Sequence, residues 1–334
     1  MVSSIAAKRR PGHPDKPKGE ASGAKQSRAL TPGRLAQAVT GDAWTLHILR
    51  HAFQGARRYS VFRDRLRAEG MPIPELVLAD RLRRLVTLSV LDRRAGVSET
   101  SRREYWLTEC GIELWTILIA IRDWESQHAV SRRSRASEKI VHARCGHAIH
   151  PVLSCGHCGV PITARDTEVD ESGPVALVTP PASAPNYRRS NAANRGSGGR
   201  FLRTQALQIL GDRWSNTLCG ALFLGLHGFG ELRGFLSIPP AILANRLAKF
   251  VALGILRREP HAQGPRRRFY RLTGKGLALF PVVFFTVDWG NRWLAAHPED
   301  FRVIHKQCGA AFRPAFACSH CGEPLHWRDI RLMS

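Results

Sequence analysis

The sequence predicts a mainly α-helical chain with small β-hairpins, an α+β fold built from two copies of one domain. The first observation is an internal repeat: Gly41-Asp42-Ala43-Trp44 returns as Gly211-Asp212-Arg213-Trp214, and the stretch 73–91 returns as 238–256. The second is that apolar residues in each copy recur at the spacing of one helix face. The third is that both copies end in the same pattern of histidine and cysteine. A repeat of this length indicates duplicated domains rather than a solenoid.

Short helices are expected at the start of each copy. Asp42 stands where it can cap the second helix, and Pro72 and Pro74 interrupt the chain before the fourth. The apolar residues that mark the helices of the first copy are Leu35 and Val39; Trp44 and Ile48; Tyr59, Phe62 and Leu66; and Leu78, Leu82 and Leu85. Those of the second copy are Trp214 and Leu218; Phe229, Leu232 and Phe235; and Leu243, Leu247 and Phe250.

A basic hairpin and a long apolar helix complete each copy. Stretches 88–91 and 105–107 predict two short strands, and the second copy carries Arg266-Arg267-Arg268 at its expected hairpin tip. Closing helices are expected at 114–124 and 277–293, with Pro281 near the first turn of the second. This order of elements is that of a winged helix-turn-helix, in which one helix enters the major groove and the hairpin reaches nearby backbone.

Composition shifts place the domain boundaries. Pro, Gly and basic residues dominate the N-terminus, and Pro and Gly return in the middle of the chain. The expected organisation is a disordered basic tail at 1–30, a winged helix-turn-helix domain at 31–128, a zinc-ribbon-like module at 138–164, a linker at 165–200, a second winged helix-turn-helix domain at 201–297, and a second module at 301–328.

Four short motifs stand at equivalent places in the two copies. In the first copy they comprise Gly41, Asp42, Trp44, Ile73, Pro74, Leu78, Arg81, Leu82, Tyr105, Leu107, Thr108, Asp123 and Trp124; in the second, Gly211, Asp212, Trp214, Ile238, Pro239, Leu243, Arg246, Leu247, Tyr270, Leu272, Thr273, Asp288 and Trp289. With these motifs, residues 35–125 and 203–294 resemble the HxlR-type bacterial transcriptional regulators. The resemblance implies a DNA-binding repressor or activator that acts as a homodimer on palindromic operators.

The chain departs from the pattern of that family in three respects. It is a tandem duplication, each copy carries a Cys/His appendix, and the fourth helices begin with few polar groups. Glu75, Leu76 and Val77 stand at the start of one, and residues 240–242 (Pro-Ala-Ile) at the start of the other. Glutamate can accept from cytosine but repels phosphate, and apolar residues contact only thymine methyl groups.

Charge points to a polyanionic partner. The formal net charge is +23, from 50 Lys and Arg against 27 Asp and Glu, which suits double-stranded DNA. The alternative is that arginine richness reflects a GC-rich genome. The candidate DNA-binding residues are Arg81, Arg84, Arg102, Arg103, Asn245, Arg246, Lys249, Arg266, Arg267 and Arg268. Arg81 and Arg246 stand beside core leucines, so bracing their helix is an equal alternative to binding phosphate.

The Cys/His appendices have the spacing of metal sites. His142-x2-Cys145-x9-Cys155-x2-Cys158 recurs as His305-x2-Cys308-x9-Cys318-x2-Cys321. Three cysteines and one histidine in two knuckles predict a structural zinc ion in each module, hence two per chain. The alternatives are a reactive dithiol in each Cys-x-x-Cys, and replacement of His142 or His305 by a neighbouring histidine.

Other classes are disfavoured. The sequence contains no phosphate-binding glycine loop, nucleophile elbow or deaminase pattern, so we expect no enzyme. Its longest apolar run, 280–287, is too short to span a bilayer, and no apolar stretch follows the basic N-terminus, so we expect a cytoplasmic protein without membrane association.

The sequence therefore favours a sequence-specific transcriptional regulator with its fourth helix in the major groove and its wing on the backbone. Two alternatives stay open: a zinc-dependent interaction or redox- or metal-sensing adaptor with degenerate winged helices, and a nonspecific architectural DNA-binding protein. The apolar wall at 282–287 is expected to pack the two copies into an internal pseudo-dimer, or to pair two chains as a homodimer.

Overall fold

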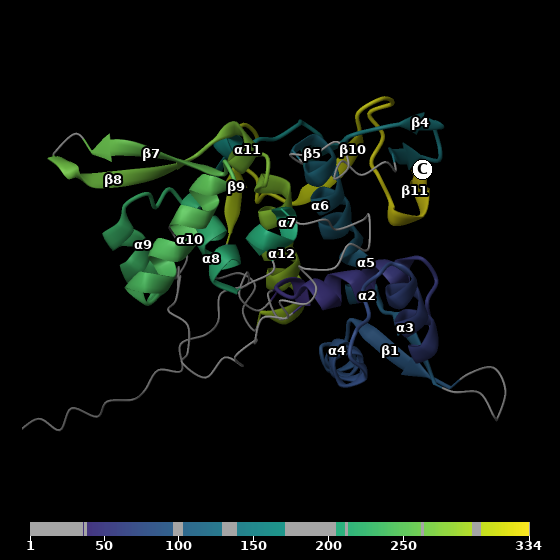
Figure 1. Ribbon diagram of the computed structural model, residues 1–334. Coiled ribbons are helices and arrows are strands. Elements are labelled where there is room, and N and C mark those ends of the chain that lie inside the picture. The colour runs from purple at the N-terminus through teal and green to yellow at the C-terminus, as the bar shows by residue number, and fades with distance from the viewer. Residues whose placement is uncertain are drawn as a thin grey trace, which may run out of the picture.

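The computed structural model describes residues 36, 39–95, 103–128, 139–170, 205–210, 213–261, 264–295 and 302–333. Figure 1 shows two helical units at opposite ends, with the closing helices of both units between them. The expected mainly α class with small antiparallel sheets is confirmed. The basic tail 1–30 and most of the expected linker lie outside the described residues.

The first unit follows the expected order of elements. It comprises α2 (Ala43–Phe53), α3 (Tyr59–Ala68), α4 (Glu75–Thr87), β1 (Leu91–Arg94), β2 (Glu104–Leu107), α5 (Glu109–Glu113) and α6 (Trp115–His128). Asp42 caps α2, because its carboxylate accepts from the backbone N–H of Thr45 at 3.1 Å. The first strand starts at Leu91 rather than at residue 88, because the chain turns through a left-handed conformation at Ser89 (φ 56°) after α4 ends.

The second unit repeats this arrangement. It comprises α7 (Gln205–Leu210), α8 (Arg213–Phe223), α9 (Phe229–Leu236), α10 (Pro240–Ala252), β7 (Leu256–His261), β8 (Gly264–Leu272), α11 (Gly274–Leu277) and α12 (Phe280–Leu294). The single closing helix expected at 277–293 is wrong at its start. Thr273 caps a separate short α11 by accepting from the N–H of Gly276, and Pro281 sits in the first turn of α12, where its missing N–H costs nothing.

Glycine is required where each short helix crosses its hairpin. A Cβ on Gly276 would stand 2.3 Å from the carbonyl oxygen of Ile255, and one on Gly111 would stand 2.1 Å from that of Val90. A threonine three positions before each of these glycines donates its hydroxyl to the turn that precedes the first strand of the hairpin. Thr108 donates to Ser89 O and Thr273 to Gly254 O, both at 2.6 Å. The repeat therefore extends to individual hydrogen bonds.

The closing helices α6 and α12 pack against each other with reciprocal contacts. Trp124 Nε1 donates to the carbonyl of Lys275 at 3.1 Å, and Trp289 Nε1 donates to the carbonyl of Cys110 at 2.9 Å. These four residues form two equivalent pairs in the repeat, since 124 corresponds to 289 and 110 to 275. Such reciprocity is the mark of an isologous, two-fold interface, here made within one chain.

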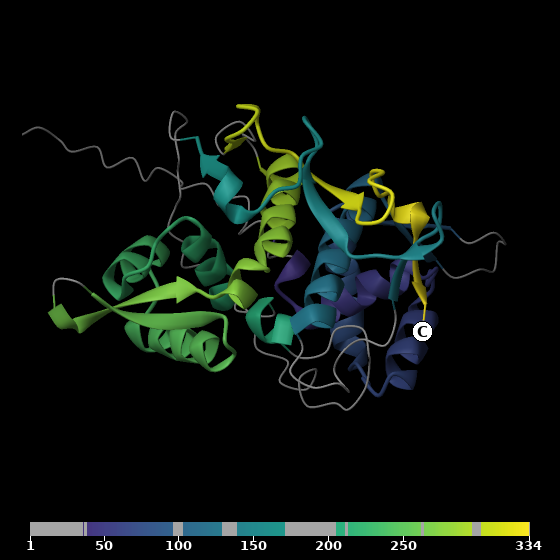
Figure 2. The same cartoon turned by 90° about the horizontal axis from the view of Figure 1, so that it is seen from above.

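The modules that follow the closing helices are interlocked. Strand β5 (Pro151–Cys155) pairs antiparallel with β10 (Pro314–Cys318), and Phe316 lies opposite Leu153. Strand β3 (Lys139–His142) pairs with β4 (His147–Ala148) and with β11 (Ile330–Met333), while β6 (Thr167–Val169) pairs with β9 (Val303–His305). Figure 2 shows these strands side by side along one side of the molecule. Strands β6 and β11 also extend the modules beyond their expected ends at 164 and 328.

The interlocked strands rest on the closing helices. Phe316 contacts Trp115 of α6, with ring centroids 6.3 Å apart, and Phe285 of α12, with centroids 4.6 Å apart. His150 Nδ1 lies 2.7 Å from Asp123 Oδ1 on α6. None of the helices within the described ranges is long and apolar enough to cross a bilayer.

His47 makes the stability of the first unit depend on pH. Burial and, secondarily, the charge of Arg50 lower the pKa of its imidazole to about 3, against an ordinary value of 6.5. The unfolded chain therefore binds one more proton between those values, and the free energy of unfolding falls as pH drops through that range. At about 1.4 kcal/mol per pH unit, the loss attributable to His47 between pH 6.5 and 5 is about 2 kcal/mol.

We expect His47→Gln to remove that part of the acid sensitivity. Urea unfolding at pH 7 and pH 5, followed by tryptophan fluorescence, measures it for both proteins. Exposed His326 offers the matched control, and His326→Gln should keep the wild-type pH dependence. Equal pH dependence in His47→Gln and wild type would contradict the assignment.

Candidate nucleic-acid interface and metal centres

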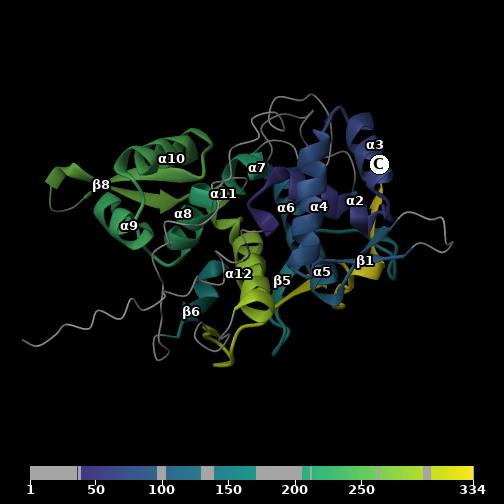
Figure 3. The same ribbon diagram turned by 90° about the horizontal axis from the view of Figure 1, so that it is seen from below.

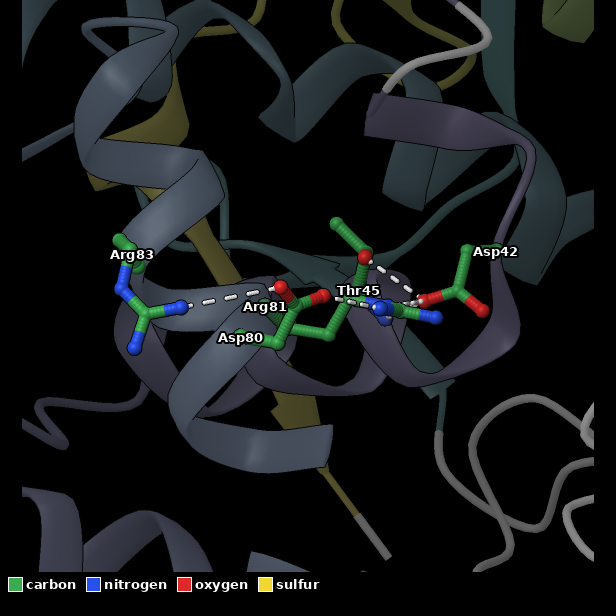
Figure 4. Close-up of polar contacts among 5 residues, drawn as sticks. All are labelled: Asp42, Thr45, Asp80, Arg81 and Arg83. Carbon is green, nitrogen blue, oxygen red and sulfur yellow. Dashed lines mark hydrogen bonds and ion pairs between the residues drawn. The ribbon is translucent and has the colours of Figure 1, made fainter. Parts of the chain in front are cut away.

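Arg81, in the middle of α4, lies between the carboxylates of Asp42 and Asp80 (Figure 4). Its Nε donates to Asp42 Oδ2 at 2.7 Å, and its Nη1 donates to Asp80 Oδ2 at 2.6 Å. The same Asp42 oxygen accepts from the N–H and hydroxyl of Thr45. Only 15% of the Arg81 side chain is exposed. Of the two interpretations of Arg81, the contacts favour bracing: it ties α4 to the cap of α2.

The outward face of α4 carries other residues. Leu76, Asp80, Arg83 and Thr87 are spaced as one helical stripe and are all exposed. Leu76 is 86% exposed and the Arg83 side chain 74% exposed. Arg84 is half-buried, and burial lowers the pKa of its guanidinium. Arg83 is therefore the most exposed arginine of α4, and it is not among the residues predicted from the sequence to bind DNA.

The equivalent helix of the second unit places its predicted residues differently. Asn245 is exposed, Lys249 is half-buried, and Arg246 is buried beside Leu243 and Leu247. Arg246 is thus more deeply buried than its equivalent Arg81, which is half-buried. Of the three α10 residues predicted to bind DNA, Asn245 is the one whose side chain is exposed.

The wings are only partly described. Arg102 lies outside the described residues, and Arg103 is exposed just before β2. The expected hairpin tip at 266–268 is wrong: these arginines lie within β8, where Arg268 stands opposite Pro260. The strands pair as far as His261 and Gly264, so this hairpin is longer than the equivalent hairpin of β1 and β2 in the first unit. The three arginines lie along its second strand.

The sequence model of the HxlR-like helix-turn-helix family matches residues 39–133 and 209–298, which together make up more than half of the chain. The chain belongs to the HxlR-like helix-turn-helix family. Both matches coincide with a winged unit and its closing helix. The resemblance to HxlR-type regulators, inferred from the motifs of both copies, is thereby confirmed for each of them.

Relatives of this HxlR-like protein include transcriptional regulators of the helix-turn-helix type. One from Mycobacterium tuberculosis (strain CDC 1551 / Oshkosh) is 35% identical over 128 residues, which is 38% of this chain and 80% of that protein. One from Bacillus subtilis (strain 168), YvaP, is 30% identical over 91 residues, 27% of this chain and 84% of that protein. A crystal structure of a candidate transcription factor shares 33% identity, with a TM-score of 0.34, and covers 37% of this chain and 88% of that one.

The eight predicted metal ligands form two clusters, but not the two that the sequence predicts. His142 and Cys145 lie with Cys318 and Cys321, and Cys155 and Cys158 lie with His305 and Cys308. The expectation that each module closes its own four-ligand set is therefore wrong. Strand pairing is the physical reason: β5 and β10 cross between the modules and carry each Cys-x-x-Cys knuckle to the His-x-x-Cys knuckle of the other copy.

The donor atoms fit a tetrahedral ion. In each cluster they all lie within 4.8 Å of one another. Cys145 Sγ lies 3.8 Å from Cys318 Sγ, and His142 Nδ1 lies 3.5 Å from Cys321 Sγ. Tetrahedral zinc with bonds of about 2.3 Å to sulfur and about 2.0 Å to nitrogen places sulfurs about 3.8 Å apart and nitrogen about 3.5 Å from sulfur. His142 and His305, rather than their neighbours, supply the nitrogen donors of the two clusters.

Backbone N–H groups favour thiolate in the knuckles. Those of His320 and Cys321 point at Cys318 Sγ, at 3.4 and 3.5 Å. Burial alone raises the pKa of Cys318, but these N–H groups, with the thiols of Cys321 and Cys145, hold it at about 6. Gly159 and Gly322, which follow the two Cys-x-x-Cys knuckles, have φ of 76° and 75°, a left-handed conformation that glycine adopts without steric cost.

The two cysteines outside the clusters are buried. Cys110 and Cys219 lie in the core. Burial raises the pKa of each thiol to about 12, which leaves both protonated and unreactive at neutral pH.

Proposed function

We propose that this HxlR-like protein is a sequence-specific transcriptional regulator. Helices α4 and α10 enter the major groove of one DNA duplex, and the two hairpins contact its backbone. The observation that carries the proposal is the reciprocal packing of α6 and α12, which joins two winged units about a local two-fold. Helix-turn-helix proteins that bind two half-sites need such an arrangement, usually from two chains. Here one chain supplies both units, which Figure 3 shows from the side opposite to Figure 2.

We further propose that each Cys/His cluster holds one structural zinc ion. Four protein donors fill a tetrahedral shell and leave no open position for a substrate. Because every shell takes two donors from each module, each ion joins the segment after α6 to the segment after α12. The zinc ions thereby fix the spacing of the two winged units.

Retention of genomic DNA tests this function. The purified, zinc-loaded chain is mixed with fragments of its own genome and excess nonspecific competitor DNA. We expect a discrete set of retained fragments. Retention of all fragments, lost at modest salt, would favour an architectural protein instead. No retention would overturn DNA binding and favour the adaptor.

The wing of the second unit should contribute to the salt dependence of binding. Each phosphate contact adds about 0.9 to the slope of log affinity against log salt. Replacing Arg266, Arg267 and Arg268 by alanine should therefore reduce that slope by up to about three contacts' worth, measured by fluorescence anisotropy across a salt series. Arg331→Ala, an exposed change on β11, is the control for lost charge and should keep the slope. An unchanged slope in the triple variant would refute backbone contact by this strand.

A further inference from the structure

The two recognition helices present different chemistry at equivalent positions. The outward stripe of α4 is Leu76, Asp80, Arg83 and Thr87; that of α10 is Ala241, Asn245, Ala248 and Ala252. Each pair is related by the same repeat offset, and all eight residues are exposed. The scaffold beneath the stripes is the same, because Leu78, Leu82 and Leu85 are buried on α4 and Leu243, Leu247 and Phe250 on α10. The repeat thus keeps the core and changes the surface.

The stripe of α10 suits A·T pairs. Asparagine bonds the N6 and N7 edge of adenine in a bidentate manner, and alanine methyl groups contact the methyl of thymine. Asn245 is flanked on the stripe by Ala241 and Ala248, whose small side chains let the helix approach the base edges closely. Nothing on this stripe matches the donor or acceptor edge of guanine or cytosine as well.

The stripe of α4 suits a half-site that contains G·C. Arg83, the exposed guanidinium, matches the O6 and N7 acceptors of guanine. Asp80 holds it, with the two charged groups 3.8 Å apart, and a carboxylate also accepts from the amino group of cytosine. Leu76 is among the few large apolar side chains of the described residues that are exposed, and a thymine methyl is the apolar feature of the major groove.

We infer that this chain binds a non-palindromic operator, with an A·T half-site under α10 and a G·C-containing half-site under α4. The inference rests on the proposed function. A homodimer of single units must present the same helix twice, so it matches a palindrome. The duplicated chain presents two different helices in one fixed arrangement, so its operator has two different halves and a direction.

Selection from a random DNA library identifies the operator. The zinc-loaded full chain is the bait, and we expect an enriched site whose two halves differ. Composite DNA that joins the two halves should bind at least about tenfold more tightly than palindromes built from either half alone. Asn245→Ala should relax the A·T half-site only, and Arg83→Ala the G·C-containing half-site only, each by about 10- to 100-fold in discrimination. Both positions are exposed, and zinc content and thermal unfolding verify that each variant folds.

Each other outcome has a distinct meaning. A palindromic enriched site, equal affinity for the palindromes and the composite, or both variants relaxing the same half-site would overturn the inference and leave the proposed function intact. Salt-sensitive binding without any enriched sequence would overturn the sequence-specific function itself, and with it the inference.

Discussion

Replacing Cys145 and Cys318 together should leave one zinc ion per chain, whereas replacing Cys145 and Cys155 together should leave none. The first pair belongs to one cluster and the second pair to both clusters. If each module closed its own site, the two results would be reversed. Zinc content by atomic emission, on serine variants purified under reducing conditions, decides between the two pairings. Wild type should bind two ions, and the single variant Cys145→Ser one.

Removal of the metal should unfold the Cys/His modules but leave the winged units helical. Zinc contributes about 10–16 kcal/mol to the folding of small zinc-dependent domains, so chelation should unfold the interlocked strands. The helices of both winged units share one hydrophobic core, and they should keep their helical circular dichroism. A spectrum and thermal transition unchanged after verified zinc removal would contradict a structural role. For the serine variants, Cys219→Ser is the matched control, because Cys219 lies outside both clusters; it should retain two ions.

Interactions between residues close in the chain were predictable from sequence. The cap at Asp42 and the buried stripe of α4 depend on spacing within a few residues. Two features could not be predicted from the spacing of apolar residues. The break before α12 depends on the cap that Thr273 provides for α11. The extra length of the β7–β8 hairpin depends on strand pairing as far as His261 and Gly264.

The ligand pairing could not be predicted from sequence. Both copies have identical ligand spacing, so a closed tetrahedral set can form within one copy or between two with the same local chemistry. The choice depends on where α6 and α12 place the modules, which is a long-range property. The role of Arg81 was undecided for the same reason: its partner Asp42 lies 39 positions away.

Replacing Trp289 by alanine should destabilise the whole chain by about 3–5 kcal/mol, the usual cost of removing a buried large aromatic side chain. Trp289 is buried where α12 meets the first unit, and its indole N–H satisfies the carbonyl of Cys110. Chemical unfolding followed by circular dichroism measures the loss. Trp327→Ala, at a position that is 36% exposed, is the control and should cost far less.

The combination with Trp124→Ala tests the two-fold interface itself. Trp124 makes the equivalent contact from the other unit, so both tryptophans stabilise one interface. Once the first substitution has weakened that interface, the second has less to remove, and the double variant should lose less than the sum of the single losses. Full additivity, with each variant unfolding only its own unit, would mean that the units are stable independently. In that case α6 and α12 would not fix the spacing of the recognition helices, and the proposed reading of two half-sites by one chain would lose its structural basis.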